Sequence, residues 1–572
     1  MHIPTEILSR AEAWLTDVYD ENTKREVQAL IDDSSEELID AFYKDMEFGT
    51  GGMRGIMGSG TNRINKYTLG AATQGLSNYL KASFEGTIKV AIAYDCRNNS
   101  DTFSKIVADV LSANGVHVYL FESLRPTPEL SYAVRELNCQ SGIVLTASHN
   151  PKEYNGYKVY WNDGAQLVPP HDKNVIEEVR KIKHEDIQFD SDSSKIEIIG
   201  EAMDQSFIDA VVNQSMSDVG KDDLSIVFTS IHGTSIKSVP PALEKAGFSQ
   251  VHIVEEQAVP DGNFPTVVSP NPEEAEALTM ALNKADEVNA DLVIGTDPDA
   301  DRIGIAVRDN AGAMKLLNGN QTAAIMTWYM LDQWKQAGKL SGNQYIAATI
   351  VTTDLLEDIA SDYNVPTYFC LTGFKWIADV IREREGKEEF ICGGEESYGF
   401  MIGDFVRDKD SVTAAMIISE IAAWAKANGS SIYQELIKIY VNHGHYQERL
   451  ISITKKGKSG AEEIQQMMVD FRLNTPETIN GVKVVQTKDF QSSEARDFNT
   501  GETTTIDLPQ SNVFQIFLAD GSKITARPSG TEPKIKFYIS VNDKLECIAH
   551  FENQYDQLQK RIDAIVDAMA IN

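Results

Sequence analysis

Strand-like and helix-like segments alternate along this chain, and the alternation starts three times. The first series runs from an apolar strand pattern at Ile88–Tyr94, through a helical pattern over Asp101–Ala113 with Asp101 as its cap, to a strand at Val116–Phe121. Similar series start at Leu224 and near Asn318, although the letters themselves do not repeat. Strands that alternate with helices build layered α/β domains. The sequence therefore predicts three α/β units of related architecture.

The pattern changes after about residue 450. A helix predicted over Ala461–Arg472 is followed by several strand-like runs, and a closing helix covers about Leu545–Ala568. This order predicts a fourth domain of the α+β type, preceded by a linker at Val441–His445. The first 45 residues or so have apolar positions at helical spacing and indicate an acidic helical arm on the first domain. We therefore expect domains at residues 1–200, 201–317, 318–445 and 446–572.

Composition narrows the class of protein. The chain has 572 residues, too many for a single hydrophobic core. Its 52 Lys and Arg residues against 85 Asp and Glu residues give a net charge of −33, which argues against nucleic acid or an anionic membrane as a partner. Five scattered cysteines favour reduced thiols over disulfides or a zinc site. With no apolar leader pattern and no spanning apolar run, we expect a cytoplasmic protein.

One serine stands between two predicted strands. Thr146–Pro151 separates the apolar runs Ser141–Leu145 and Tyr157–Trp161, and it presents Ser148 beside His149. A serine displayed at strand ends suits covalent chemistry, but a free serine is a weak nucleophile that needs activation. Taken alone, a serine in this position is more often an ordinary loop residue that caps the turn.

An acidic tract follows a second buried strand. Asp297, Asp299 and Asp301 alternate with Pro298 and Ala300, and on an extended backbone such spacing puts the three carboxylates on one side. Oxygen ligands alone favour Mg²⁺ over zinc. The alternative is a solvated acidic turn, in which three like charges would repel each other.

Other polar loops carry residues suited to anions and hydroxyl groups. A glycine-dense loop presents Arg54, and Arg97 either faces a phosphate or pairs with Asp95, of which we favour the pairing. The turn Gly393–Gly399 offers Glu395 and Ser397 to hydroxyl groups of a sugar. Two further loops contain the possible ligand contacts Thr372, Gly373 and Lys375, and an anion cradle at Arg527–Lys534 with two hydroxyls and a glycine.

Together these loops resemble the α-D-phosphohexomutase family. The motifs TASHNP, DPDADR, GGEES and RPSGTEP occur in the family's order, and the resemblance extends from about Phe48 to the end of the chain. It implies three related mixed α/β domains and a C-terminal α+β domain around a central cleft. Pro298 replaces a glycine that is common in other branches of the family, which changes the local backbone freedom.

The resemblance also implies a role for each motif residue. Ser148 is expected to carry a phosphoryl group, and Lys158 to act as general acid or base. The remaining implied positions are the Mg²⁺ ligands Ser148, Asp297, Asp299 and Asp301, the sugar readers Glu395 and Ser397, the phosphate cradle Arg527, Ser529, Gly530 and Thr531, and the supporting residues Arg54, Arg97, His149, Arg302 and Lys375.

The expected activity is the interconversion of glucose 1-phosphate and glucose 6-phosphate through glucose 1,6-bisphosphate, which also acts as activator. The GEES form of the sugar loop is typical of glucose-preferring members. Open alternatives are a mutase for mannose or pentose phosphates, a catalytically silent sugar-phosphate-binding protein and a Mg²⁺-dependent phosphatase. We expect a monomer or a weak homodimer that binds sugar phosphates.

Overall fold

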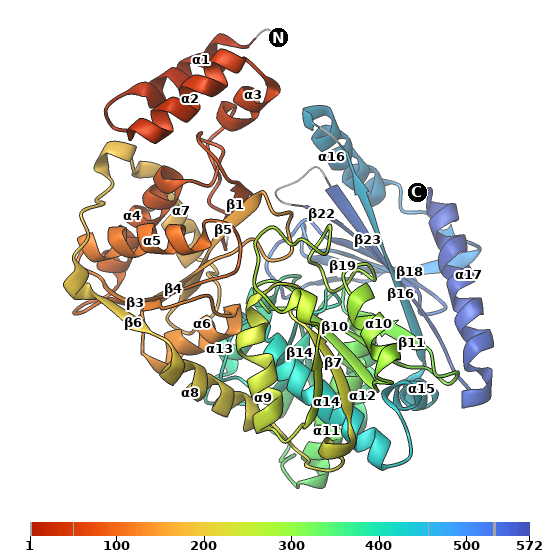
Figure 1. The fold of residues 1–572 in the computed structure, drawn as a ribbon. Coiled ribbons are helices and arrows are strands. Elements are labelled where there is room, and N and C mark those ends of the chain that lie inside the picture. Colours follow the sequence, from red (N-terminus) through yellow and green to blue (C-terminus); the bar gives the residue numbers. More distant parts are fainter. Residues whose placement is uncertain (1–2, 50, 456, 530–533, 572) are drawn as a thin grey trace. The chain divides into compact units, whose positions relative to one another are not determined.

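The computed structural model describes residues 3–49, 51–455, 457–529 and 534–571 (Figure 1). The chain forms two compact units. The first comprises Met1–Asn318, Ala378–Glu385 and Ser397–Gly429, and the second comprises Gly319–Ile377, Gly386–Glu396 and Ser430–Asn572. Among the described residues, no helix combines the length and the apolar character needed to cross a membrane.

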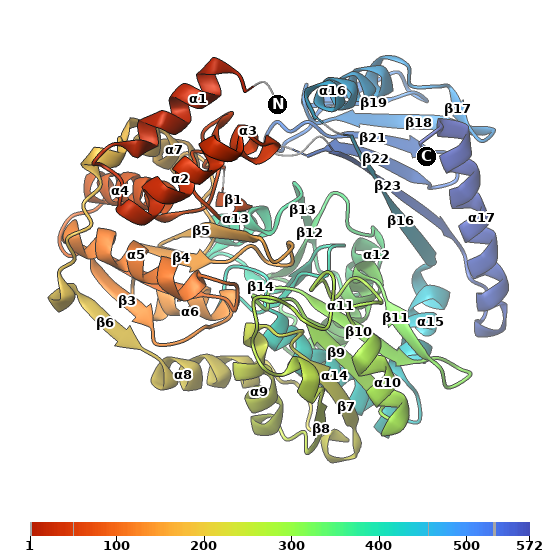
Figure 2. The same cartoon turned by 45° about the horizontal axis from the view of Figure 1, so that its top comes forward.

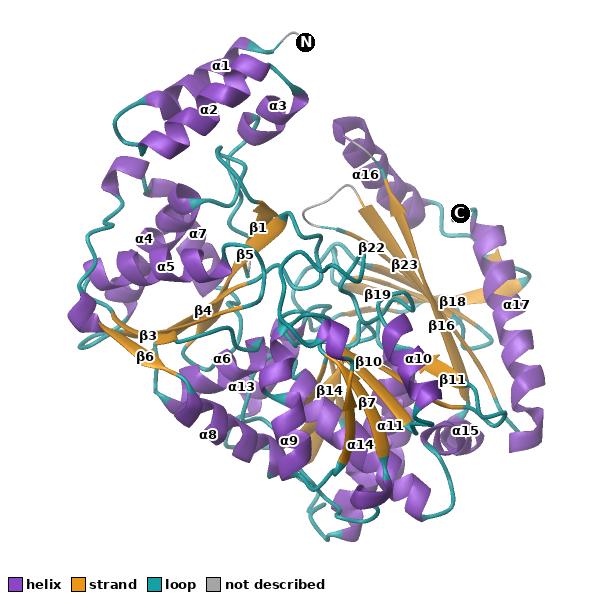
Figure 3. Ribbon diagram, in the orientation of Figure 1, coloured by secondary structure: helices purple, strands orange, loops and turns teal. Residues whose placement is uncertain are grey.

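The N-terminal arm consists of helices, as predicted (Figure 3). Helices α1 (Thr5–Glu12), α2 (Glu21–Asp33) and α3 (Glu36–Phe42) pack around a buried cluster that includes Trp14 and Phe42. Tyr67 belongs to the same cluster and comes from α4 (Lys66–Ser83), so the arm is anchored on the first domain.

The first sheet has the strand order β1-β5-β4-β2-β3-β6. Strands β4, β2, β3 and the edge strand β6 are parallel, and β5 is antiparallel to its neighbours β4 and β1. The strands span Gly52–Ile56 (β1), Lys89–Tyr94 (β2), His117–Phe121 (β3), Ser141–Leu145 (β4), Tyr154–Trp161 (β5) and Ile196–Ile199 (β6).

Helices cover both faces of this sheet because alternate strand residues point to opposite sides. Ile92 packs with residues of α4, α5 (Ser100–Ala113) and α7 (His171–Lys181), whereas Ala91 and Ala93 pack with residues of α6 (Thr127–Glu136). The prediction that Asp101 caps α5 is wrong. The cap is Asn99, whose φ of 65° is left-handed, a conformation that asparagine tolerates better than most residues.

The second sheet also belongs to the first unit and has the order β11-β10-β9-β7-β8. Strands β7, β8 and β9 are parallel, and β9, β10 and β11 form an antiparallel meander. Their bounds are Ser225–Thr229 (β7), Gln250–Ile253 (β8), Leu292–Thr296 (β9), Ile303–Arg308 (β10) and Met314–Leu317 (β11). Helix α10 (Thr279–Glu287) follows a series of turns over residues 273–278.

Further helices and one short strand complete the first unit. Helix α8 (Glu201–Val212) contributes Met203 to the core of the first domain, and α9 is Val239–Lys245. After the short strand β15 (Phe400–Ile402), α14 (Ser411–Ala427) packs against α8, α9 and β9. Asp410 caps α14 by accepting the N–H groups of Val412 and Thr413.

In the second unit, strand β12 pairs in parallel with β13 and β14. These strands are Gln344–Thr349 (β12), Thr367–Cys370 (β13) and Glu389–Gly394 (β14), and the accompanying helices are Gly319–Gln336 (α11), Leu355–Asp362 (α12) and Ile432–His443 (α15). Helix α13 (Phe374–Arg384) is divided between the two units.

The C-terminal sheet is antiparallel, with the order β16-β23-β22-β21-β18-β19-β20 and β17 beside β18 (Figure 2). Its strands are His445–Thr454 (β16), Thr478–Ile479 (β17), Val482–Asp489 (β18), Glu494–Asp497 (β19), Thr503–Thr505 (β20), Phe514–Leu518 (β21), Lys523–Pro528 (β22) and Lys534–Asp543 (β23). Helices α16 (Gly457–Leu473) and α17 (Phe551–Met569) share one hydrophobic core with this sheet. The predicted linker Val441–His445 is not an irregular segment, because α15 runs to His443 and β16 begins at His445.

Candidate active site

Ser148 lies in the turn after β4 and faces the aspartate loop of the second sheet. Its Oγ donates a hydrogen bond of 2.7 Å to Asp297 Oδ2 and lies 3.2 Å from His149 Nδ1. The residue is buried, and its φ of 52° is unusual for a residue with a side chain. The structure therefore brings together two sequence-predicted site residues, in a backbone conformation of the kind found at functional sites.

The three aspartates converge, but on a turn. Ala300 has a φ of 56°, and Asp297 Oδ1 accepts the N–H groups of Asp301 and Arg302 at 3.0 and 2.9 Å. The expectation of an extended backbone is wrong, because an aspartate side chain that bonds the backbone ahead of it favours a tight turn. One carboxylate oxygen from each of Asp297, Asp299 and Asp301 lies within 4.8 Å of the others.

These carboxylates fit a hard divalent cation. All three are almost fully buried, and burial together with the charges of Asp299 and Asp301 raises the pKa of Asp297 well above its ordinary value. Asp299 Oδ1 and Asp301 Oδ1 are buried oxygens without a hydrogen-bond partner in the part of the chain that the structure describes. Such uncompensated oxygens are costly, and an ion with the oxygen preference of Mg²⁺ would satisfy them.

Two lysines contact the same carboxylates. Lys158 Nζ, on β5, lies 2.7 Å from Asp299 Oδ2 and 3.0 Å from Asp301 Oδ2, and Lys409 Nζ lies 3.2 Å from Asp301 Oδ2. Burial alone would lower the pKa of Lys158, but the two carboxylates outweigh it and raise the pKa above its usual value. A lysine base at neutral pH needs a lowered pKa, so this arrangement favours a charged Lys158 that donates a proton.

Sequence reasoning missed Lys409. It lies in the run Arg407-Asp408-Lys409-Asp410 before α14, where alternating charges next to a buried helix were the available signal. Lys409 Nζ also contacts Asp408 Oδ1 at 3.1 Å, and Asp408 Oδ2 accepts the hydroxyl of Tyr160 on β5 at 2.7 Å. These contacts link the loop of Lys409 to both the aspartate turn and the first sheet.

Arg97 holds the serine turn from behind. Its fully buried guanidinium donates hydrogen bonds to the backbone carbonyls of Ser148 (2.6 Å), Pro151 (2.8 Å) and Tyr154 (3.0 Å), and also to that of Asn150. Its Nε lies 3.4 Å from Asp95 Oδ2, which confirms the predicted pairing. The family-based expectation that Arg97 supports a phosphate is not met here, because backbone carbonyls take its terminal N–H groups.

Other predicted cations surround the serine. The exposed Arg54, on β1, donates to Asn150 Oδ1 at 3.0 Å, and Arg302 pairs with Glu273 at 2.5 Å. Burial and the charges of Arg302 and Arg54 lower the pKa of His149 well below its ordinary value, so the imidazole is neutral at pH 7. The site thus pairs several cations with its buried carboxylates. Ser397 also belongs to this unit and lies in a half-buried turn.

The second unit holds most of the residues predicted to bind the sugar. Glu395 is buried, and its Oε1 accepts the N–H of Gly373 at 2.9 Å, which joins two of the predicted loops. Thr372 Oγ1 is buried without a hydrogen-bond partner among the residues that the structure describes, and Lys375 is half-buried at the start of α13.

The phosphate cradle is described only in part. Arg527 lies on β22, and the N–H of Ser529 donates to the carbonyl of Lys534 at 2.7 Å. Gly530 and Thr531 fall outside the described residues. Burial and the charge of Glu395 raise the pKa of Glu396 to about 7, against the opposing charges of Lys536 and Arg527. Glu396 is therefore a second carboxyl group beside the predicted sugar reader, which sequence reasoning overlooked.

Comparisons with known proteins match most of the chain. The chain matches the family descriptions "Phosphoglucomutase/phosphomannomutase, alpha/beta/alpha domain I" at residues 45–186, domain II at residues 205–312 and domain III at residues 318–440. A phosphoglucomutase of Staphylococcus aureus (strain MRSA252) is 39% identical over 534 residues, which cover 93% of this chain and 94% of that protein.

Solved structures share the fold. A putative phosphomannomutase from Thermus thermophilus has a TM-score of 0.68 at 19% identity and covers 92% of this chain and 98% of its own. The open form of parafusin, a phosphoglucomutase from Paramecium, has a TM-score of 0.67 at 17% identity over 92% of this chain and 96% of its own. The predicted fold class, three α/β domains followed by a further C-terminal domain, is confirmed. With three consecutive domain matches and a relative at this identity over nearly its whole length, the chain belongs to the phosphoglucomutase/phosphomannomutase family.

Proposed function

We propose that this chain is a phosphoglucomutase, which interconverts α-D-glucose 1-phosphate and glucose 6-phosphate through a phosphoserine at Ser148. The observation that carries the proposal is the 2.7 Å contact between Ser148 Oγ and Asp297 within a buried cluster of three carboxylates. Phosphoryl transfer depends mainly on alignment and on neutralising charge around the moving group. The name phosphoglucomutase of a relative at 39% identity supports glucose as the sugar.

The residues of the first unit would carry out the transfer. The sugar hydroxyl oxygen bonds to the phosphorus, the bond from phosphorus to Ser148 Oγ breaks, and the proton of the sugar hydroxyl replaces the one that Lys158 gives to the oxygen of Ser148. Lys158, which is charged beside Asp299 and Asp301, is placed to supply positive charge and that proton. A Mg²⁺ ion held by the three aspartates and Ser148 would neutralise negative charge on the transferred group. Arg54, His149, Lys409 and Arg302 surround the same groups.

The second unit would recognise the substrate. We assign sugar contacts to Glu395 with Thr372, Gly373 and Lys375, and to Ser397 of the first unit. The non-reacting phosphate is assigned to Arg527, Ser529, Gly530 and Thr531. The intermediate, glucose 1,6-bisphosphate, presents its other phosphoryl group to Ser148 after it turns around, so the same compound also activates an unphosphorylated enzyme. We place the enzyme in the cytoplasm, as a monomer or weak homodimer.

Replacement of Ser148 tests the proposal. Ser148→Ala should abolish mutase turnover, while the Kd for glucose 1-phosphate stays within about threefold of the wild type because the sugar contacts remain. Ser249→Ala, at an exposed serine outside the site, serves as the control and should turn over normally. Mass spectrometry should find a phosphoryl group on the peptide of Ser148. Full turnover by Ser148→Ala would refute the role of this serine.

The sugar assignment has its own test. Rates with glucose 1-phosphate, mannose 1-phosphate and ribose 1-phosphate are compared in the presence of catalytic glucose 1,6-bisphosphate. We expect the highest kcat/KM for glucose 1-phosphate, by at least about tenfold, since an altered hydroxyl leaves polar partners unpaired. A preference for mannose or ribose would overturn the sugar and leave the mutase chemistry standing. Release of inorganic phosphate without isomerisation would instead indicate a phosphatase.

A further inference from the structure

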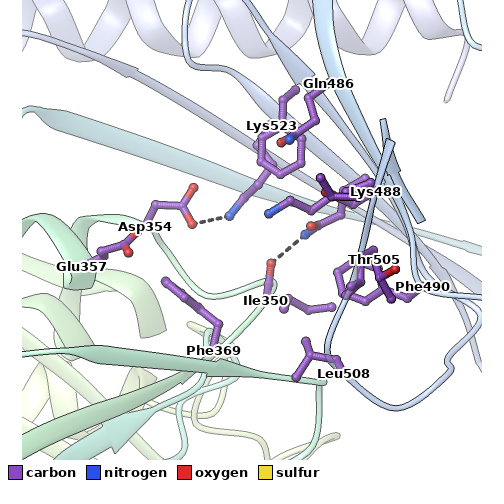
Figure 4. A pocket seen from close by; sticks show the side chains of 15 residues that line it. Ile350, Asp354, Glu357, Phe369, Gln486, Lys488, Phe490, Thr505, Leu508 and Lys523 are labelled. Atoms are coloured by element: carbon purple, nitrogen blue, oxygen red, sulfur yellow. Dashed lines mark hydrogen bonds and ion pairs between the residues drawn. The ribbon is translucent and has the colours of Figure 1, made fainter. Parts of the chain in front are cut away.

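A cavity of about 550 Å³ lies within the second unit, between α12 and the C-terminal sheet (Figure 4). We call it the lysine pocket and define it by Asp354, Glu357, Phe369, Lys488, Phe517 and Lys523. Its volume falls in the range of small-molecule sites. Among the described residues that line it, none belongs to the proposed sugar-binding or phosphate-binding set. The lysine pocket is therefore separate from the groups that the reaction uses.

The walls of the lysine pocket are fixed by contacts between the elements that form it. Lys523 Nζ, at the start of β22, lies 2.6 Å from Asp354 Oδ1 beside α12. Gln515 Nε2, on β21, donates a hydrogen bond of 2.8 Å to the carbonyl of Ile350 after β12. A buried hydrophobic cluster that includes Ile350 and Phe490 packs beneath them. A cavity held in this way is preformed, which lowers the cost of binding a ligand.

Lys488 provides an unsatisfied charge in the lysine pocket. Its half-buried side chain extends from β18 into the cavity beside Lys523, and its Nζ lies 5.0 Å from the centre of the Phe517 ring (Figure 4). Within the described chain, this Nζ has no hydrogen bond or ion pair, whereas Lys523 is paired with Asp354. Burial and the charge of Lys523 lower the pKa of Lys488, and the opposing charges of Asp354 and Glu357 offset this only in part. An anion beside Lys488 would compensate it.

The rest of the lining sets the shape and charge of the ligand. Phe369, Phe517 and the neighbouring Leu508 present apolar surface to the cavity. Asp354 and Glu357 face the same space, so a ligand with two or three negative charges would meet repulsion. A ligand with a single negative charge at Lys488 avoids this repulsion, and an aromatic body can pack against the phenyl rings.

We propose that the lysine pocket binds a small organic monoanion with an aromatic body, and that Lys488 is the residue that recognises its charge. This site goes beyond the proposed mutase reaction, because the sugar phosphates of that reaction carry more charge and no apolar body. Binding in the lysine pocket does not involve the residues of the first unit that are proposed to transfer the phosphoryl group.

The probe for this proposal is 1-anilinonaphthalene-8-sulfonate, a fluorescent aromatic monoanion. The full-length protein should bind one equivalent saturably, and Lys488→Gln should weaken binding about tenfold or more, as expected for losing one charged hydrogen bond. Lys483→Gln is the matched control, because Lys483 lies on the same strand, is exposed and bonds Asn499 outside the pocket. The neutral analogue N-phenyl-1-naphthylamine should bind weakly and equally to all three proteins.

A second variant covers the case in which Lys488→Gln misfolds. Thr505→Trp, at an exposed position of β20 that lines the cavity, should narrow the pocket and also weaken the sulfonate probe about tenfold. Mutase turnover without the probe should stay within about twofold of the wild type in both variants. Equal probe affinity in the wild type and the variants would overturn the proposal. Complete displacement of the probe by glucose 1,6-bisphosphate would overturn it too, because it would place the probe at the reaction site.

Discussion

Arg97→Lys tests whether the serine turn must be held rigidly for the reaction. The guanidinium of Arg97 donates to four backbone carbonyls of residues 148–154 while it pairs with Asp95. Lysine has one nitrogen on a flexible stem and cannot reach this set of acceptors, so the substitution leaves buried carbonyls without donors. The positive charge is kept, so the substitution separates the effect of the planar guanidinium geometry from the effect of the charge.

The structure sets the expected size of the effect. Each hydrogen bond from a charged donor contributes about 1.5 kcal/mol or more, and lysine can replace one or two of the four. With two or three bonds lost, we therefore expect a loss of about 3–4.5 kcal/mol or more in the free energy of unfolding of the first unit. A shift of Ser148 by about 1 Å should lower kcat about a hundredfold. KM should change much less, because the proposed sugar contacts lie on other residues.

The assay couples formation of glucose 6-phosphate to reduction of NADP⁺, and hydrogen exchange of residues 146–156 reports on the turn itself. Arg308→Lys is the matched control, since Arg308 also binds backbone carbonyls, those of Ala285, Ala290 and Gly312, but lies outside the site. It should lose stability while it keeps its turnover. A kcat of Arg97→Lys that stays close to the wild-type value, or an equal loss of kcat in Arg308→Lys, would refute the reasoning.

Two further predictions concern buried titratable groups. Lys409→Met removes an ammonium group 3.2 Å from Asp301, so turnover should fall at least about tenfold. The Kd for Mg²⁺, measured by calorimetry, should decrease about threefold or more because a competing positive charge is gone, and weaker Mg²⁺ binding would contradict this. Burial lowers the pKa of His445 to about 4. The contribution of the neutral imidazole to the free energy of unfolding is therefore complete above about pH 6.5 and is lost as the pH falls through 4, which lowers that free energy by about 3 kcal/mol. His445→Phe retains the stacking on Phe551 but does not titrate. The melting temperature of this variant should therefore rise relative to that of the wild type as the pH falls, and a constant difference between about pH 4 and 7 would exclude titration of His445 as the cause.

The buried strands can be predicted because each is a continuous run of apolar residues. The predicted strand Ser141–Leu145 has the same bounds as β4, and the buried strand predicted before the aspartates is β9 (Leu292–Thr296). Both are short apolar runs between turn-forming residues, and both are buried along their whole length. Their ends present the serine and the aspartates, so the positions of these groups on strand ends also follow from the sequence.

Strand β16 cannot be predicted in the same way. Its residues His445–Thr454 mix charged and apolar side chains; His445 and Gln447 are buried, and half-buried and exposed positions alternate over residues 449–454. It becomes a strand because it pairs over its full length with β23, which follows some ninety residues later in the chain. A local pattern does not identify such a distant partner, so the sequence at the start of this strand resembles a linker.

Arg97 shows the same limit within the site. Its pairing with Asp95 is local and follows from two residues of separation. Its bonds to the carbonyls of Ser148 and its neighbours span more than fifty residues, and backbone carbonyls leave no mark in the sequence. The same holds for Lys409, whose partner Asp301 comes from another part of the chain. The sequence alone therefore does not distinguish an Arg or Lys that holds the backbone from one that binds substrate; the distinction needs the three-dimensional contacts of its N–H groups.

A mutase must present two different hydroxyl groups of a sugar to one serine, and the division of this chain into two units suits that requirement. Ser148, Lys158, Lys409 and the three aspartates all lie in the first unit, where direct contacts join them. Glu395 and Arg527 lie in the second unit. Because the contacts among the transfer groups are complete inside one unit, they do not depend on which end of the sugar is presented. In the proposed mechanism the groups of the first unit perform the same transfer twice, and the proposed recognition residues accept two orientations of one substrate.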